Sequence, residues 1–277
     1  MVKGEKTMTV RLVTNEKIAV TSSRGNQEKW CDNGYWYKLD QFGYESLAET
    51  LTSQILEQSN IEKETPFRFV KYSMTVVNVH KYDRVGCISK NFLKENQSIV
   101  TVNTLLGKYL SQPLKQELIS LSSDKKRIKY LVDAVKDCTG LCEFGQYLTL
   151  LFEIDSLILN DDRHLNNIAV IEENNKFDYC PIFDNGAGLL SNLQLLRPDI
   201  MPKALIRLLR ASPFDMTFNR ELKTARGMFG SVLYVPKFKK DDILKMLSPL
   251  LEYYPNRDRG IITDRVTECI MTRQKML

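Results

Sequence analysis

The chain has 277 residues, of which 43% are hydrophobic and 26% are charged, and these fractions are those of an average globular protein. They exclude collagen, a long disordered tail and a pure coiled coil, and the length allows one large domain or two modest ones. The 39 basic and 34 acidic side chains give a net charge of +5, which is compatible with an anionic ligand but is not by itself a nucleic-acid signature.

Targeting and metal-binding patterns are weak. No apolar run reaches the roughly 18–20 residues that a membrane helix needs, and no apolar leader follows the first methionine. Among the six dispersed cysteines only Cys138 and Cys142 are close, and with His80 and His164 as the two histidines a structural zinc site is not expected. Such cysteine usage is typical of a reducing compartment. We therefore expect a cytoplasmic protein without a membrane span, and export by a route without a signal stays open.

The opening third is rich in Val, Thr, Tyr and Trp and is interrupted by turns that contain Gly and Asn, which predicts an antiparallel meander. Its expected strands are Met8–Val13, Ile18–Ser22, Gln27–Cys31 and Tyr35–Leu39. Apolar residues at helical spacing predict one amphipathic helix over Glu45–Glu57. Further strands are expected over Phe67–Tyr72, Met74–Lys81 and Val85–Ser89.

The remainder of the chain has mainly helical periodicity. It is strongest over Leu141–Leu159, whereas Ile99–Thr104 fits a strand or a loop equally well. A short strand pair follows over Ile168–Ile171 and Phe177–Ile182, and the last third is helical over Met201–Leu209, Asp241–Tyr254 and Ile261–Met276. These patterns predict an α+β fold of two lobes, a β-rich lobe over residues 1–95 and a helical lobe over 96–277, with the boundary between 86 and 105.

The residues richest in chemistry lie between the long apolar helix and the strand pair. Two acids, an arginine, a histidine and two asparagines occupy the stretch 161–167, and further along Asp184 follows an apolar strand and precedes a turn that contains glycine. Mg²⁺ prefers oxygen ligands from one or two side chains together with phosphates, which suits Asn167 and Asp184. Asp162 lies five residues before Asn167, where it could orient an attacking hydroxyl, and Arg163 could hold the loop or the transferring phosphate. Asp and Asn also cap helices and form turns, and Asp161 fits that simpler role.

These residues carry a resemblance to known kinases. The block D-R-H-L-N-N-I from Asp162 to Ile168 resembles the catalytic loop of phosphatidylinositol 3- and 4-kinases, and I-F-D-N-G from Ile182 to Gly186 is similar to their metal-binding motif. The bacterial HipA-like Ser/Thr kinases share this atypical kinase fold and, more loosely, the same pair of motifs. Ser22–Trp30 resembles the S-x-x-G-x-Q-x-K phosphate-binding stretch of that family, and Gly86–Phe92 resembles the hinge of the short CtkA-type kinases.

The resemblance covers most of residues 18–190 and implies a two-lobed atypical kinase with ATP and Mg²⁺ as cofactors. It implies that Lys38 contacts the α- and β-phosphates and that its helix partner is Glu45, with Glu49 one turn later as the alternative. His164 would have a supporting role at the site. The implied catalytic residues are Asp162, Asn167 and Asp184, of which Asn167 and Asp184 would hold the metal. The implied nucleotide-binding residues are Ser22, Ser23, Gly25 and Asn26 at the phosphates, and Cys87, Ser89 and Asn91 in a hinge whose backbone (87–91) would hold adenine.

Two positions depart from the resembling sequences, and the second of them leaves the class of acceptor open. Arg24 stands where resembling sequences often have a small residue, and the pair Arg163-His164 is closer to the lipid kinases than to HipA-like ones. The function expected first is ATP-dependent phosphorylation of protein Ser or Thr, including the protein's own chain. The resemblance implies Ser22 as an autophosphorylation position, and the neighbouring Ser23 fits almost as well. The alternatives are a lipid or small-molecule kinase, a nucleotide-binding pseudokinase, and a metal-dependent hydrolase built from Asp162, Asp184 and His164.

Overall fold

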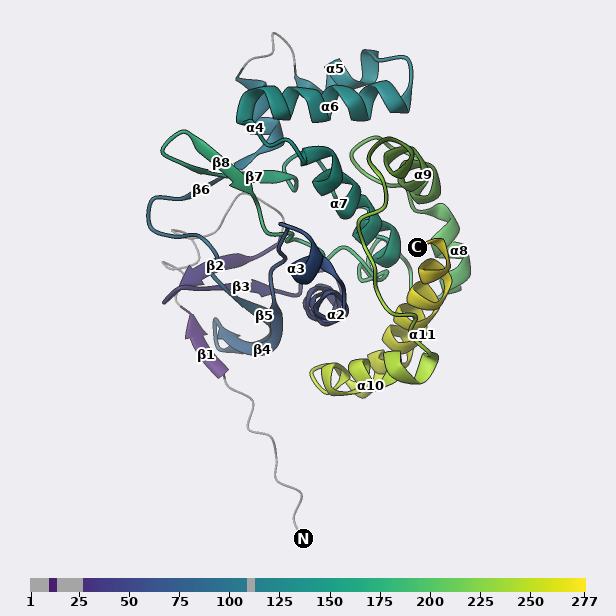
Figure 1. Ribbon diagram of the computed structural model, residues 1–277. Helices are drawn as coiled ribbons and strands as arrows, with labels where there is room; N and C mark the ends of the chain where they lie inside the picture. The colour runs from purple at the N-terminus through teal and green to yellow at the C-terminus, as the bar shows by residue number, and fades with distance from the viewer. Residues whose placement is uncertain (1–9, 14–26, 109–112) are drawn as a thin grey trace.

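The computed structural model describes residues 10–13, 27–108 and 113–277. A five-stranded sheet lies on one side of the molecule, and the helices of the second half lie on the other (Figure 1). The predicted strand Ile18–Ser22 and the predicted phosphate-binding residues Ser22, Ser23, Gly25 and Asn26 lie outside the described residues. The predicted α+β class is confirmed.

The large sheet has the strand order β1-β4-β5-β3-β2. Its strands are β1 (Val10–Val13), β2 (Lys29–Asp32), β3 (Tyr35–Leu39), β4 (Tyr72–Val79) and β5 (Tyr82–Lys90). Asn33 and Gly34 have φ angles of 49° and 76°, which fits the two-residue turn that closes the β2–β3 hairpin. β1 instead pairs in parallel with β4, so the expectation of a sequential antiparallel meander is wrong at this strand. Turn residues reveal local hairpins, whereas a pairing between distant strands leaves no such pattern.

The segment 67–72 is not the expected strand, because regular pairing begins only at Tyr72. Val70 N donates to Ile182 O at 2.9 Å, and Ile182 N donates to Arg68 O at 2.8 Å. This short parallel bridge joins the chain that leads into the large sheet to the chain that leads into Asp184. The two parts of the predicted site are therefore tied through the backbone.

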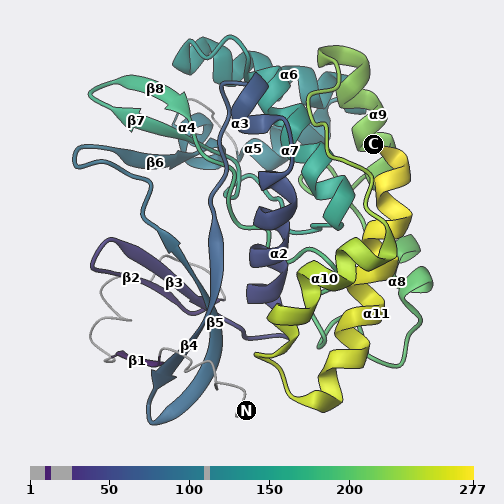
Figure 2. The same cartoon turned by 60° about the horizontal axis from the view of Figure 1, so that its bottom comes forward.

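Helix α2 (Glu45–Glu57) has the predicted bounds, and the short α3 (Ile61–Glu64) follows it. Leu47, Leu51 and Ile55 are fully buried, as the helical spacing of the apolar residues predicts. In the turned view, α2 lies between the large sheet and α10 (Lys240–Leu251) (Figure 2). Its apolar face belongs to the same core as the later helices, so α2 is fixed from both sides.

A second, antiparallel sheet has the order β6-β7-β8. It is formed by β6 (Ser98–Thr101), β7 (Ala169–Glu173) and β8 (Lys176–Tyr179). The segment Ile99–Thr104, which fitted a strand or a loop equally well, therefore begins within β6 and continues into a helix. The helices between β6 and β7 are α4 (Val102–Gly107), α5 (Leu114–Ser120), α6 (Asp124–Thr139) and α7 (Phe144–Ile158). α7 is buried along nearly its whole length, because its apolar residues surround the axis, and it forms the centre of the helical part (Figure 1).

The last third packs around α7 and α2. Its helices are α8 (Pro202–Leu208), α9 (Phe218–Phe229), α10, α11 (Asn256–Arg273) and the short 3₁₀ turn Gln274–Met276. The hydroxyl of Tyr254, between α10 and α11, donates to Asp40 Oδ2 at 2.6 Å and so ties these helices to the chain between β3 and α2. None of the helices within the described residues combines the length and apolar character needed to cross a bilayer.

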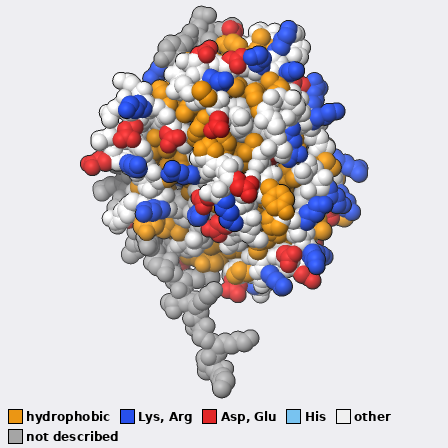
Figure 3. All heavy atoms as spheres, viewed as in Figure 1, with side chains coloured by type: hydrophobic (Ala, Val, Ile, Leu, Met, Phe, Trp, Pro, Cys, Tyr) orange, Lys and Arg blue, Asp and Glu red, His pale blue; other side chains and the backbone are white. Residues whose placement is uncertain are grey.

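The surface charge is uneven on the face that Figure 3 shows. Lys and Arg side chains are more frequent along the edge formed by α8, α9 and α11, and acidic side chains are interspersed among basic ones over the rest of this face. Interspersed charge of this kind is that of an ordinary solvated surface.

Candidate active site

The loop that carries the predicted catalytic residues begins where α7 ends. Leu159 has a φ of 56°, a left-handed conformation that ends the helix and turns the chain. The side-chain amide of the buried Asn160 then donates to Asp155 Oδ1 at 3.0 Å and to the carbonyl of Asp184 at 3.2 Å. Its Oδ1 accepts from Asp162 N at 3.2 Å. Asn160, which the sequence did not single out, therefore fixes the loop to both α7 and the Asp184 segment.

Arg163 is fully buried at the centre of this arrangement. Its guanidinium forms an ion pair with Asp155 on α7, at 3.0 Å between Nη2 and Oδ1, and its Nε donates to both carboxylate oxygens. Nη1 donates to the carbonyl of Phe183 at 2.6 Å, and Nη2 donates to Asn185 Oδ1 at 2.7 Å. Of the two roles considered for Arg163, the structure supports holding the loop, because these contacts occupy its donors and it has no exposed surface.

Asn167 is held by hydrogen bonds within its own loop. Its Nδ2 donates to the carbonyl of Asp162 at 2.9 Å, and its backbone N donates to the carbonyl of His164 at 2.8 Å. The amide oxygen Oδ1 accepts no hydrogen bond from the described residues. That oxygen is therefore available as a ligand for a hard cation.

Asp162 presents its carboxylate to solvent, with 64% of the side chain exposed. Partial burial of the loop raises the pKa of Asp162, and the nearby Asp184 carboxylate adds to the rise, while His164 and Arg163 oppose it. The nearest approach of His164 is 3.8 Å, from Nε2 to Asp162 Oδ1, and its side chain is 47% exposed. An accessible carboxylate with a raised pKa is suited to accept a proton from an incoming hydroxyl.

Asp184 and Lys38 meet across the two halves of the molecule. Lys38 Nζ, on β3, lies 2.6 Å from Asp184 Oδ1 and 2.5 Å from Glu49 Oε1, and the Lys38 side chain is 8% exposed. Burial favours a higher pKa for Asp184, but the positive charges of Lys38, Lys29 and Arg163 outweigh it and hold the pKa well below its usual range. The carboxylate of Asp184 is therefore ionised at every physiological pH.

The partner of Lys38 on α2 is Glu49, so the expectation of Glu45 is wrong. Glu49 is fully buried, and its second oxygen accepts from Asn185 N at 2.9 Å, which links α2 to the Asp184 segment. Glu45 points back instead and accepts from the backbone N of Phe42 at 2.7 Å and of Gly43 at 3.1 Å. The two glutamates lie one turn apart, about 6 Å along the helix axis. Glu45, the first residue of α2, accepts hydrogen bonds from two residues that precede the N-cap Tyr44.

Lys29 on β2 is a further basic residue of the site that the sequence analysis did not assign. The β2–β3 register places it directly opposite Lys38. Burial lowers the pKa of Lys29, while Asp184 raises it, so Lys29 lies within electrostatic range of the same carboxylate. The two-residue turn at Asn33-Gly34 fixes this register, and from it the pairing of the two lysines was predictable.

The expected hinge residues lie differently from the prediction. Cys87 and Ser89 are buried within β5, which pairs with β3 on one side and with β4 on the other, so the sheet already uses their backbone groups. Asn91 N donates to the carbonyl of Gly34 at 2.8 Å. The chain that links the two sheets therefore begins after Asn91, where Phe92 packs at 6.4 Å between ring centroids from Phe183, the residue before Asp184.

The donor atoms around Asp184 fit a cation that is shared with phosphates. Within the described part of the chain, no three His, Cys, Asp or Glu side chains are grouped so as to hold a metal ion by themselves. One ionised carboxylate from Asp184 and one amide oxygen from Asn167 form the kind of partial oxygen set on which Mg²⁺ and a triphosphate together rely. The hydrolase alternative required Asp162, Asp184 and His164 to form a metal site, and these residues form no such group.

A β-rich half with a buried Lys–Glu pair, followed by a helical half with this Asp–Asn loop and Asp184, defines a protein-kinase-like fold. The structure matches the crystal structure of the Helicobacter pylori proinflammatory kinase CtkA over 92% of this chain and 93% of that chain, with a TM-score of 0.53 and 14% sequence identity. A second match is to a chain in the structure of the Shewanella oneidensis MR-1 toxin–antitoxin system HipA, HipB and its operator DNA. It covers 91% of this chain and 64% of that one, with a TM-score of 0.47 and 12% identity. No family model matches the sequence, and neither does any curated protein. The likeness to CtkA confirms the predicted fold.

Proposed function

We propose that the protein is an ATP-dependent kinase that transfers the γ-phosphate to Ser or Thr of proteins, including its own chain. The observation that carries the proposal is the position of Lys38, which contacts both Glu49 and Asp184 on a kinase-like fold. Phosphoryl transfer depends mainly on positioning and on compensation of charge, and this arrangement supplies both.

ATP would lie between the parts formed by residues 1–95 and 96–277. Lys38 and Lys29 would bind its phosphates as point charges, since both lie near Asp184. The adenine would lie beside the linker after β5, against the apolar surface of Phe92 and Phe183. The loop residues Ser22, Ser23, Gly25 and Asn26, just before β2, would cover the phosphates, as the resemblance implies.

Asp184 and Asn167 would hold Mg²⁺ through carboxylate and amide oxygen. The bound ion would neutralise charge on the phosphate oxygens. The low pKa of Asp184 supports this role, because its carboxylate needs no deprotonation before it binds a cation. Asn160 and Arg163 would keep both ligands in place through their hydrogen bonds to the Asp184 segment.

Asp162 would orient the acceptor hydroxyl and take its proton. The bond between the acceptor oxygen and the γ-phosphorus forms as the bond from that phosphorus to the bridging oxygen of ADP breaks. The raised pKa and the exposure of the Asp162 side chain support this role.

Incubation with Mg²⁺ and ATP labelled at the γ-phosphate tests the proposal and the class of acceptor. We expect label in protein bands, the kinase's own band among them. Label confined to a lipid extract or to small molecules would indicate the lipid-kinase alternative, and nucleotide binding without transfer would indicate a pseudokinase.

The Lys38–Glu49 pair gives a matched test of the site. We expect Glu49→Gln to lower kcat/KM for phosphate transfer by about 10–100-fold, the effect of losing one charged hydrogen bond at a buried cation. Glu45→Gln, one turn away, should stay within about threefold of wild type, because Glu45 makes no contact with Lys38 and the amide oxygen can still accept one of its two turn hydrogen bonds. Steady-state kinetics on both proteins make the comparison. Equal losses in the two variants would show that the Glu49 assignment is wrong.

A further inference from the structure

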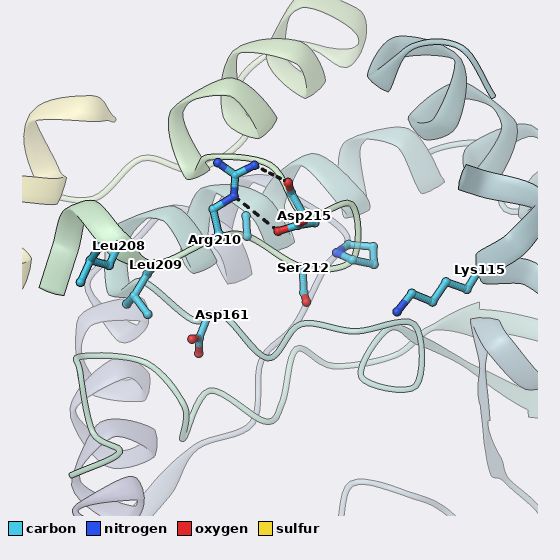
Figure 4. A pocket seen from close by; sticks show the side chains of 9 residues that line it. Lys115, Asp161, Leu208, Leu209, Arg210, Ser212 and Asp215 are labelled. Carbon is cyan, nitrogen blue, oxygen red and sulfur yellow. Dashed lines mark hydrogen bonds and ion pairs between the residues drawn. The ribbon is translucent and has the colours of Figure 1, made fainter. Parts of the chain in front are cut away.

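A hollow of about 420 Å³ lies beside the loop that holds Asp162. Three separate parts of the chain line it (Figure 4). They are Lys115 of α5, Asp161 of the loop, and the segment from Leu208, at the end of α8, to Asp215, without Phe214. The proposed function places neither ATP nor Mg²⁺ in this hollow. Asp161 directly precedes Asp162, so the hollow lies close to the loop at which the proposed function places the acceptor hydroxyl.

The hollow combines an apolar wall with one unpaired carboxylate. Its apolar side chains are Leu208, Leu209, Ala211 and Pro213. Leu208 is 67% exposed, so much of its side chain is free for contact with a ligand. Among the described residues, no cation forms an ion pair with Asp161 within 4.0 Å.

The two cations of the hollow are placed away from Asp161. Arg210 pairs with Asp215. Its Nη2 donates to the carbonyl of Asp215 at 2.6 Å, and its Nε lies 3.4 Å from the Asp215 carboxylate. Figure 4 shows this guanidinium turned toward Asp215, and it shows Lys115 on the opposite side of the hollow from Asp161. Burial raises the pKa of Asp161 to about 6, and Asp162 adds to the rise, so Asp161 is mainly ionised at neutral pH. The Asp161 carboxylate therefore carries a negative charge that no cation lining the hollow pairs with.

We propose that this hollow binds an arginine or lysine side chain of the substrate polypeptide, close in sequence to the Ser or Thr that is phosphorylated. This inference rests on the proposed kinase function and specifies its substrate class. Arginine and lysine carry a charged tip on an apolar stem, which matches a carboxylate beside an apolar wall. The stem would lie on Leu208, Leu209 and Pro213, and the tip would reach Asp161. An extended chain advances roughly 3.3–3.6 Å per residue, so the basic residue lies within a few positions of the acceptor.

Synthetic peptides with one Ser acceptor and otherwise neutral residues test the proposal. A single Arg is placed one to four positions before or after the Ser, and each peptide is compared with its Gln counterpart. We expect at least one Arg position to lower KM by about tenfold in the wild type, which is the value of one charged contact. Asp161→Asn should abolish this preference, and Asp161→Lys should favour a Glu peptide instead. Asp133→Asn, at an exposed site on α6, is the matched charge control and should keep the preference.

A second variant tests the contribution of the apolar wall. Leu208→Ser, at an exposed position, should reduce the preference for the Arg peptide without unfolding the protein. A wild type without any preference for basic peptides, or an Asp161→Asn protein that keeps it, would overturn the proposal. Phosphorylation of the protein's own chain is followed in the same reactions. Self-phosphorylation without a basic preference overturns this inference alone, whereas no transfer to any acceptor contradicts the proposed function as well.

Discussion

Replacement of Asp184 by alanine is expected to slow phosphate transfer by roughly a thousandfold or more, since charge stabilisation by a bound metal ion is worth several kcal/mol. The same change should weaken Mg²⁺-dependent ATP binding, because one of the two oxygen ligands is lost. Asp162→Ala should slow transfer as well but leave ATP affinity close to that of the wild type, because Asp162 acts on the acceptor hydroxyl. Transfer rates and nucleotide affinity, measured on both variants, distinguish the two roles.

Asp178→Ala is the control for these substitutions, since Asp178 lies at an exposed position of β8, away from Lys38. It should behave like the wild type in both measurements. Full autophosphorylation by the Asp184→Ala protein would refute the metal assignment. Equal loss of ATP affinity in the Asp162→Ala and Asp184→Ala proteins would show that the division of roles is wrong.

Loss of the Arg163 side chain is expected to lower the free energy of unfolding by about 3–5 kcal/mol, because Arg163→Ala leaves Asp155 as a buried charge without its partner. For a chain of this size, that corresponds to a melting temperature about 10 °C lower. Arg197→Ala, which removes an exposed ion pair with Asp199, should change stability by less than about 1 kcal/mol. Urea or thermal unfolding of the two variants makes the comparison.

The same variant separates the two roles considered for Arg163. If Arg163 contacted the transferring phosphate, its loss would raise KM for ATP and leave stability nearly unchanged. A normal melting temperature together with weak ATP binding would therefore contradict the role that the buried contacts to Asp155, Phe183 and Asn185 indicate.

The parts of the fold that local patterns determine were predictable. The helical spacing of Leu47, Leu51 and Ile55 predicts α2 with its observed bounds, although the structure buries this helix on nearly every side. The motif residues Asp162, Asn167 and Asp184 were also singled out from the sequence, because D-R-H-L-N-N-I followed by I-F-D-N-G resembles a pair of kinase motifs. The likeness to CtkA supports the fold that these motifs implied, whereas the roles of the individual residues stay predictions.

Tertiary packing decided what the sequence left open. Glu45 and Glu49 share one face of α2, and only the position of Lys38 on β3 selects Glu49. The parallel pairing of β1 with β4 joins strands that are far apart in the chain, and no turn pattern records it. Lys29 is the intermediate case, since its position opposite Lys38 follows from the length of one hairpin turn.

The last third of the chain carries no motif, and its contribution became visible only in the structure. Its helices pack on α7, where the buried Glu153 accepts hydrogen bonds from Arg226 at 2.6 Å and from the backbone N of Val232 at 3.0 Å. The connection between α8 and α9 also forms one wall of the hollow beside Asp161. These helices therefore hold α7, the helix that leads into the Asp162 loop, and they form part of the surface on which we expect the acceptor to bind.

Intact-mass measurement of the purified protein after incubation with Mg²⁺ and ATP, followed by mapping of the modified residues, tests the central claim most directly. The account predicts added mass in whole phosphate increments on Ser or Thr residues of the wild-type chain, and no increment on the Asp162→Ala or Asp184→Ala proteins. An unchanged wild-type mass in a sample that binds ATP, or the same increments on all three proteins, would contradict it.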